Sequence, residues 1–180
     1  MTDESPLELY PVPMARLWQV LYLVGVAVVA GAVAWSLKVG FTWTAICLLV
    51  VGVPLGGLYW YMIFYAPSRV YIGLGKTSMI VAAAPFAVRE IPYSAIERVF
   101  EIDLKNPAPE NESLKPGKSK RGLKVGGYRA GVFELAGGKD GVFATSSYTA
   151  YALRTAEGFV FVRPARPQQF REMLAAYGVS

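Results

Sequence analysis

The sequence predicts a membrane-anchored α+β protein. Its N-terminal part is a hairpin of two transmembrane helices, followed by a small antiparallel β barrel or sandwich that a C-terminal helix caps. Two observations indicate the hairpin: the chain is 54% apolar, and between Met14 and Ser68 only Arg16 and Lys38 carry charge. A third observation indicates the β domain, because the remaining sequence changes to short β-rich segments separated by turn residues and ends in one amphipathic pattern.

The two apolar runs are each long enough to cross a bilayer. Residues 17–37 contain no charged residue, and a helix over this run measures about 30 Å, the thickness of the hydrocarbon core. The second span is placed at about 43–65, and Lys38 lies in the short turn between the spans. Trp18 and Trp35 flank the first run, as expected for rings at the headgroup level. The alternative is a buried helical hairpin of a soluble protein.

These spans define the expected organisation of the chain. Residues 1–15 form a tail, residues 16–66 form the transmembrane hairpin, and residues 67–180 form the β domain. Small residues at four-residue spacing favour close packing of two membrane helices. The helix-packing candidates on this basis are Ala27 and Gly31 in the first span, and Gly52 and Gly56 in the second.

The distribution of positive charge predicts an orientation. Arg16 precedes the first span, and Arg69 and Lys76 follow the second, whereas Lys38 alone lies in the turn. The positive-inside rule therefore favours a cytoplasmic location for both termini.

The β domain is predicted from three hairpins of alternating segments. Their turns lie at Gly75-Lys76, at residues 137–140 and at residues 155–158, and each contains glycine. About seven or eight antiparallel strands result. Residues 105–121 are rich in Pro, Asn, Ser and charge, which predicts a long exposed loop.

A C-terminal helix is predicted over residues 167–177. Pro167 suits a first helical position and Gly178 suits a helix end. Four apolar residues recur at i, i+3, i+4 and i+7 and make one stripe: Phe170, Met173, Leu174 and Tyr177. We expect this stripe to cover an open end of the barrel or the gap between two sheets.

Four stretches carry a resemblance to a known family. They are YIGLGKTSMIV, REIPYSAIERV, GGYRAGVFELAGG and GFVFVRPARPQQFREML. Over about residues 69–175 the sequence resembles membrane-anchored bacterial pleckstrin-homology (PH) domain proteins. The resemblance implies a PH-like fold, a multi-pass location in the bacterial cytoplasmic (inner) membrane, and a scaffold or protein-interaction role without enzymatic activity. The first hairpin turn offers only Lys76, so inositol-phosphate recognition is not carried over.

Residue content narrows the chemistry that this chain can perform. There is no histidine, and Cys47 is the single cysteine. A Ser-His-Asp triad, a Cys-His pair and the usual His/Cys zinc sites therefore cannot be built within one chain. Glu97, Glu101 and Asp103 on a predicted strand are interpreted as solvent-facing charge rather than as a cation site. We expect no enzyme activity, no cofactor and no metal.

One basic cluster remains as a candidate contact surface. It comprises Lys115, Lys118, Lys120, Arg121, Lys124 and Arg129. Each Lys or Arg near an anionic membrane contributes about 1 kcal/mol of attraction, but a merely solvated loop is equally compatible with this composition. Nucleic acid is not an expected partner, because no stacking aromatics are interleaved with the lysines.

The glycines next to this cluster do not form a phosphate loop. Phosphate loops lead from a strand into a helix, whereas VGGYRAG is followed by VFELA, a strand pattern. We expect these glycines to permit positive φ angles or a bulge.

The expected function is that of a scaffold or protein-interaction module at the membrane surface, working with a partner in a membrane complex or as a homo-oligomer. The alternative is a domain that senses anionic lipid headgroups through residues 115–124.

Overall fold

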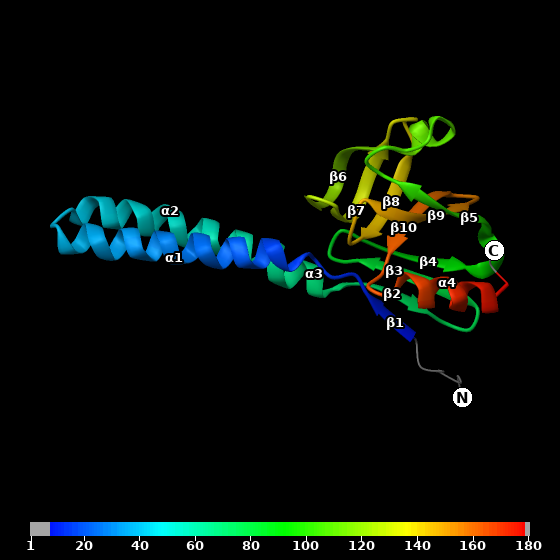
Figure 1. The fold of residues 1–180 in the computed structure, drawn as a ribbon, viewed down its shortest axis with the longest axis horizontal. Helices are drawn as coiled ribbons and strands as arrows, with labels where there is room; N and C mark the ends of the chain where they lie inside the picture. The colour runs from blue at the N-terminus through cyan, green and yellow to red at the C-terminus, as the bar shows by residue number, and fades with distance from the viewer. Residues whose placement is uncertain (1–7, 179–180) are drawn as a thin grey trace. The chain divides into compact units, whose positions relative to one another are not determined.

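The computed structural model describes residues 8–178, and the chain divides into two compact units. One unit is residues 14–66, and the other combines residues 1–13 with residues 67–180. Figure 1 shows the first unit as helices and the second as a β fold closed by helix α4. Part of the expected N-terminal tail is therefore structured: Glu8–Pro11 form strand β1 of the β unit.

The helical unit consists of two long apolar helices. Helix α1 covers Arg16–Lys38, and helix α2 covers Thr42–Trp60. A π-helical segment, Tyr61–Tyr65, and the short α3, Ala66–Ser68, continue α2. The most apolar stretches of these helices have mean hydropathies of 2.2 and 1.9, and only 6% of each stretch is buried. Within residues 8–178 these are the helices long and apolar enough to cross a membrane.

The contact between α1 and α2 involves the glycines of the second helix. The Tyr22 hydroxyl donates a hydrogen bond to the carbonyl oxygen of Gly56 at 2.9 Å. A Cβ placed on Gly52 would lie 3.4 Å from Val29 Cγ1. Ala27 is exposed, and a Cβ on Gly31 would meet no atom within 4 Å. The first predicted pair is thus not at this contact, because Tyr22 and Val29 lie on a different face of the 3.6-residue helix.

The first β sheet contains four antiparallel strands in the order β1-β2-β3-β4. Its strands after β1 are β2 Val70–Leu74, β3 Ser78–Ala83 and β4 Ala87–Pro92. The predicted turn at Gly75-Lys76 joins β2 to β3. Strand β1 pairs with β2 along its full length, so the sheet takes its first strand from before the helical unit and the others from after it.

The second sheet has six strands in the order β5-β9-β10-β8-β7-β6. In chain order they are β5 Ile96–Asp103, β6 Pro116–Val125, β7 Tyr128–Leu135, β8 Asp140–Thr145, β9 Thr149–Thr155 and β10 Gly158–Arg163. The predicted hairpins β7–β8 and β9–β10 are present. The fold is mixed rather than all antiparallel, because β10 inserts between β9 and β8 and runs parallel to β8. The two sheets share no strand, so no barrel is closed.

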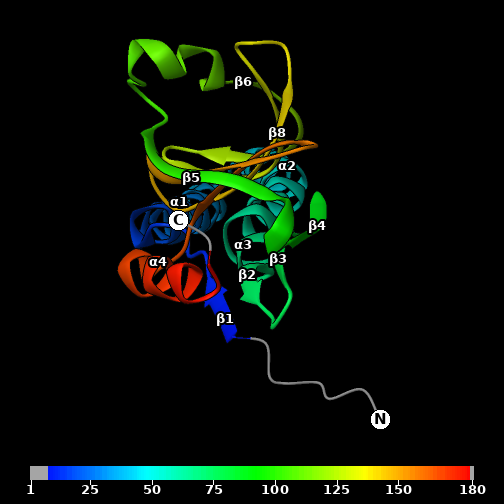
Figure 2. The same cartoon turned by 90° about the vertical axis from the view of Figure 1, so that its right-hand side faces the viewer.

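Helix α4, Pro167–Ala176, covers the gap between the two sheets. The Phe170 ring lies 5.6 Å from the Tyr10 ring of β1 and 6.3 Å from the Tyr151 ring of β9. Figure 2 shows α4 beside β1 from the end of the β unit. Phe170 and Leu174 are fully buried, which confirms the apolar stripe predicted for this helix.

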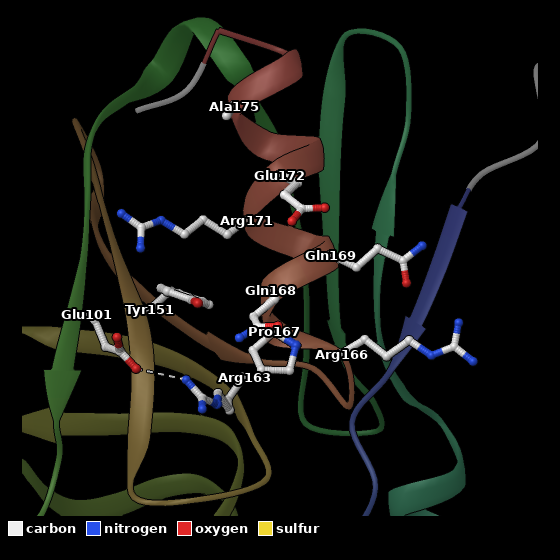
Figure 3. A pocket seen from close by; sticks show the side chains of 10 residues that line it. All are labelled: Glu101, Tyr151, Arg163, Arg166, Pro167, Gln168, Gln169, Arg171, Glu172 and Ala175. Atoms are coloured by element: carbon white, nitrogen blue, oxygen red, sulfur yellow. Dashed lines mark hydrogen bonds and ion pairs between the residues drawn. The ribbon is translucent and has the colours of Figure 1, made fainter.

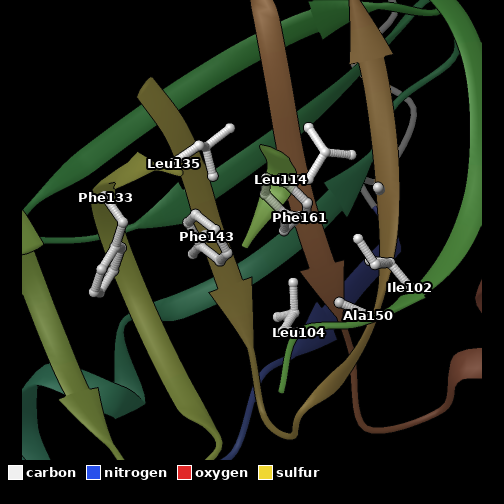
Figure 4. Close-up of a cluster of buried hydrophobic side chains, with 9 residues drawn as sticks. Ile102, Leu104, Leu114, Phe133, Leu135, Phe143, Ala150 and Phe161 are labelled. Atoms are coloured by element: carbon white, nitrogen blue, oxygen red, sulfur yellow. The ribbon is translucent and has the colours of Figure 1, made fainter. Parts of the chain in front are cut away.

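A second apolar cluster lies on the six-stranded sheet (Figure 4). Phe143 of β8 stacks on Phe161 of β10 at 4.4 Å, and Phe133 of β7 meets Phe143 edge-to-face at 5.1 Å. Leu114 joins the cluster from a 3-10 helix, Pro109–Leu114, in the β5–β6 connection. Each of the three phenylalanines has no exposed surface, so burial of this aromatic row is a main source of stability for the sheet.

The expected loop over residues 105–121 is shorter than predicted. Its last six residues, 116–121, belong to β6, which begins at Pro116 and pairs with β7. Strand β6 lies at the edge of the sheet, where charged side chains remain in solvent while one side of the backbone is paired. A lysine-rich composition occurs in exposed edge strands as well as in loops. For this reason the prediction of a loop from composition was wrong for residues 116–121.

Two facing glycines let β6 and β7 approach closely. Gly122 and Gly131 are partners in the register, and Gly131 has φ +123°. A Cβ on Gly131 would lie 2.2 Å from the Arg121 carbonyl oxygen. A register shift occurs in β6 between Ser119 and Arg121. The glycines next to the basic cluster are thus structural, as predicted from the sequence.

Substitution of Gly131 tests this close approach. We expect Gly131→Ala to lower the free energy of unfolding by about 3 kcal/mol, because backbone strain adds to a steric clash. Gly138 is the control: its φ is also positive, at +77°, but open space surrounds it. Gly138→Ala should cost about 1–2 kcal/mol, from the backbone conformation alone. Thermal unfolding of the full chain in detergent measures both, and equal losses would contradict the close approach.

Candidate functional site

The predicted basic cluster lies mainly on the edge strand β6. Lys118, Lys120, Arg121 and Lys124 belong to the strand and are exposed, and Lys115 immediately precedes it. The structure therefore presents these cations along an extended strand rather than on a loop. Because successive side chains of a strand point to opposite faces, the cluster is divided between the two faces of the sheet edge.

Lys120 already has an acidic partner. Its Nζ lies 2.7 Å from Asp140 Oδ1 of β8, and the hydrogen bond to Asp140 raises the pKa of Lys120. Within residues 8–178, no ion pair is made by the other four exposed cations, Lys115, Lys118, Arg121 and Lys124. These four are the members of the cluster that are available to a ligand.

Arg129 differs from the rest of the predicted cluster. It is the second residue of β7 and is only 4% exposed. Burial lowers the pKa of Arg129, because removal from water disfavours the charged guanidinium. Arg129 therefore does not belong to the exposed surface on which the sequence placed it.

A groove of about 980 Å³ in the β unit gathers charged residues that the sequence did not bring together. Its lining comes from β5, β9, β10 and α4 (Figure 3). The residues are Glu101, Tyr151, Arg163, Arg166, Pro167, Gln168, Gln169, Arg171, Glu172 and Ala175. We call this the arginine groove, after its three arginines.

One arginine of the groove is held in place by its neighbours. Arg163 Nη1 donates a hydrogen bond to Glu101 Oε1 at 3.0 Å, and its guanidinium carbon lies 5.8 Å from the centre of the Tyr151 ring. Its side chain is 22% exposed. The ion pair and the ring contact together restrict its rotamers, so Arg163 is positioned for recognition before any ligand arrives.

The other two arginines of the groove are exposed. Arg166 immediately precedes α4, and Arg171 is the fifth residue of this helix. In Figure 3, Arg171 extends on the side of Tyr151, and Arg166 extends on the opposite side of the helix. Neither makes an ion pair with a residue in the range 8–178. The helix begins without a side-chain cap and has no acidic residue in its first turn. Its uncapped N–H groups add to the positive potential of the groove.

The predicted acidic residues are engaged elsewhere. Glu97 forms an ion pair with Arg154 at 3.0 Å, Glu101 holds Arg163, and Asp103 Oδ1 accepts hydrogen bonds from the amides of Lys105 and Asn106. No group of three possible metal-ligating residues occurs in the part of the chain that the structure describes. Glu101 thus has a role that the sequence did not indicate, as the partner of a groove arginine.

Comparison with known proteins adds no relative: no family model, curated protein or solved structure matches this chain. The resemblance to PH domain proteins stays a prediction. The function of this chain is therefore inferred from the geometry and charge of the basic cluster and the arginine groove.

Proposed function

We propose that this protein is a non-enzymatic, membrane-anchored interaction module, whose β unit binds an acidic segment of a partner protein in the arginine groove. The observation that carries the proposal is the groove itself. It combines a positioned Arg163 with two exposed arginines that have no acidic partner among the described residues. Arginine is enriched at protein interfaces, where its planar guanidinium binds carboxylates through two parallel hydrogen bonds.

The size and composition of the groove suit a peptide segment. Its volume of about 980 Å³ lies at the upper end of the range for small-molecule pockets. Polar side chains of Gln168 and Gln169 from the first turn of α4 add hydrogen-bonding groups. Glu101 is neutralised by Arg163, and the lining then holds Arg166 and Arg171 against one carboxylate, Glu172. The groove therefore keeps a net positive charge of one.

The proposed setting is a membrane surface. Helices α1 and α2 have the length and hydropathy of membrane spans, and we infer that they cross the bilayer as a two-span anchor. A single residue, Arg69, separates α3 from β2, so the β unit would be held close to the lipid headgroups. The resemblance to bacterial PH domain proteins supports the bacterial cytoplasmic membrane as this location, with a PH-like role for the β unit.

A second candidate function is recognition of anionic headgroups by the edge strand β6. The observation that favours it is the set of four exposed cations without an ion pair in residues 8–178: Lys115, Lys118, Arg121 and Lys124. Such contacts would orient the β unit on the membrane rather than recruit it, because the helical anchor already holds it there.

Charge reversal separates these two functions. A photo-crosslinking amino acid at Gln168, in the groove, should capture a partner in native membranes. The double variant Arg166→Glu/Arg171→Glu should lower this capture by about tenfold or more, because like charges placed together cost several kcal/mol. The captured peptide should be rich in Asp and Glu, and it will show whether the partner is another protein or a second copy of this chain.

The matched control is Lys118→Glu/Arg121→Glu, which changes the net charge by the same amount on β6. It should retain the partner crosslink and lose adhesion of the full chain to phosphatidylglycerol vesicles. Capture of a basic or apolar peptide, or equal loss in both variants, would contradict groove recognition. Thermal unfolding of both variants checks that each one folds.

Orientation in the membrane is a separate prediction. Arg16, Arg69 and Lys76 flank the helical hairpin, and only Lys38 lies in its turn, so we expect both termini on the cytoplasmic side. A compartment-sensitive reporter fused after Ser180 should be active only in its cytoplasmic form. Activity of the periplasmic form of the reporter would show that the C-terminus lies in the periplasm and would contradict the predicted orientation.

A further inference from the structure

Arg129 is a buried cation for which the described part of the chain supplies no counter-charge. It lies on β7 between two neighbouring strands, opposite Lys124 of β6 and Thr145 of β8. Residues directly opposite each other share one face of a sheet. Arg129 is 4% exposed and Thr145 is fully buried, yet no ion pair to Arg129 occurs within residues 8–178.

Arg129 and Thr145 have polar side-chain atoms that lack hydrogen-bond partners among the described residues. Arg129 Nη1 donates to the Gly127 carbonyl oxygen at 3.4 Å, which is a long bond. Arg129 Nε and Thr145 Oγ1 are buried and have no partner among the described residues. Each buried polar group left unpaired destabilises the folded state, and a charged group does so more strongly than a neutral one. Native proteins rarely keep such groups unless a water molecule or an ion completes them.

Further positive charge surrounds the pair. The ring of Tyr148 has two cations near it: the Arg129 guanidinium carbon is 5.4 Å from its centroid, and Lys105 Nζ is 5.7 Å from it. Lys124, opposite Arg129, is exposed. The nearest acidic residue along the chain from Lys105 is Asp103, whose Oδ1 accepts hydrogen bonds from the backbone amides of Lys105 and Asn106.

The backbone around these side chains is closely packed. Gly127 lies in the turn between β6 and β7, and a Cβ there would approach the backbone of Ser147 and Tyr148 to 3.1 Å. The β6–β7 turn and the β8–β9 loop are thus in contact. The amide of Leu104 also donates to the Tyr148 carbonyl oxygen at 2.7 Å, which ties the end of β5 to the same loop.

We propose that Arg129 and Thr145 form a binding site for a phosphate group, together with Lys124, which lies opposite Arg129, and Lys105, which lies near the same Tyr148 ring. A water molecule would satisfy Nε and Oγ1 but would leave the positive charge uncompensated. A phosphate oxygen accepts hydrogen bonds from both groups and also neutralises the guanidinium, with which it makes short, charge-assisted contacts. None of these four residues lines the arginine groove, although Thr145 is the register partner of Arg163, which does. The phosphate site does not depend on the proposed protein partner.

The phosphate group has two possible sources, inorganic phosphate and the headgroup of an anionic lipid. The experiment uses the full chain in maltoside micelles, which contain no phosphate, and follows thermal unfolding. One arm compares inorganic phosphate with chloride at equal ionic strength. The other arm, without inorganic phosphate, compares micelles that contain phosphatidylglycerol with micelles that contain an uncharged diacylglycerol.

Three variants make the readout specific. Arg129→Met removes the buried charge, Thr145→Val removes only the hydroxyl, and Lys139→Met is the matched control that removes one exposed positive charge from the β7–β8 turn. A ligand that binds only the folded state raises Tm. We expect a rise of several degrees for the natural sequence and for Lys139→Met, a smaller rise for Thr145→Val, and none for Arg129→Met.

The source and the site are read from different comparisons. A rise with inorganic phosphate assigns a site for the free anion, and a rise confined to phosphatidylglycerol assigns a headgroup site. Without ligand, Arg129→Met should unfold at the same temperature as the natural sequence or a higher one, because removal of an uncompensated buried charge relieves its desolvation cost.

Two results would overturn the proposal. One is a natural chain whose Tm rises neither with phosphate nor with phosphatidylglycerol. The other is an Arg129→Met variant that responds as the natural sequence does. If Arg129→Met does not fold, the nearly isosteric variant Thr145→Val provides the test. A ligand-induced rise in Tm as large as that of the natural sequence would then overturn the proposed site.

Discussion

The pairing of β1 with β2 is the interaction on which the rest of the β unit depends. Tyr10 lies opposite Ile72 in this register, although the whole helical unit separates the two strands in sequence. Strand β1 in turn positions α4: the Pro11 carbonyl oxygen accepts a hydrogen bond from the amide of Ala165, and Tyr10 contacts Phe170. Because α4 forms one wall of the arginine groove, the groove depends on a strand that precedes helices α1 and α2.

Elements with a strong local pattern could be predicted from the sequence. The uncharged runs, the hairpins around glycine turns and the apolar stripe from Phe170 to Leu174 all reflect periodicity over a few residues. Strand β1 could not be predicted in this way, because it is four residues long and its pairing partner is distant in sequence. The parallel placement of β10 beside β8 is likewise non-local. Strand β6 was missed for another reason: its lysines and glycines are typical of loops, but an edge strand tolerates them.

The candidate sites show the same limit. Residues 115–129 form one basic stretch of the sequence. From the sequence alone, their cations are predicted to share one surface. Strand alternation and pairing give them different environments, since Lys120 is neutralised by Asp140 and Arg129 is buried opposite Thr145. The arginine groove is assembled from three strands and a helix, so no short window contains it. Its only local signal is the arginine content of RPARPQQFRE around the start of α4.

Strands β1 and β2, which flank the apolar helical hairpin in sequence, pair with each other. An intramolecular disulfide in native membranes tests this pairing most directly. Pro11 and Tyr71 are register partners, and opposed residues of antiparallel strands lie within disulfide range. The variant Pro11→Cys/Tyr71→Cys, with Cys47→Ser to remove the only natural thiol, should form the disulfide within single chains that remain in carbonate-washed membranes. Reduced cysteines after oxidation, disulfides only between chains, or release of the chain from washed membranes would contradict the account.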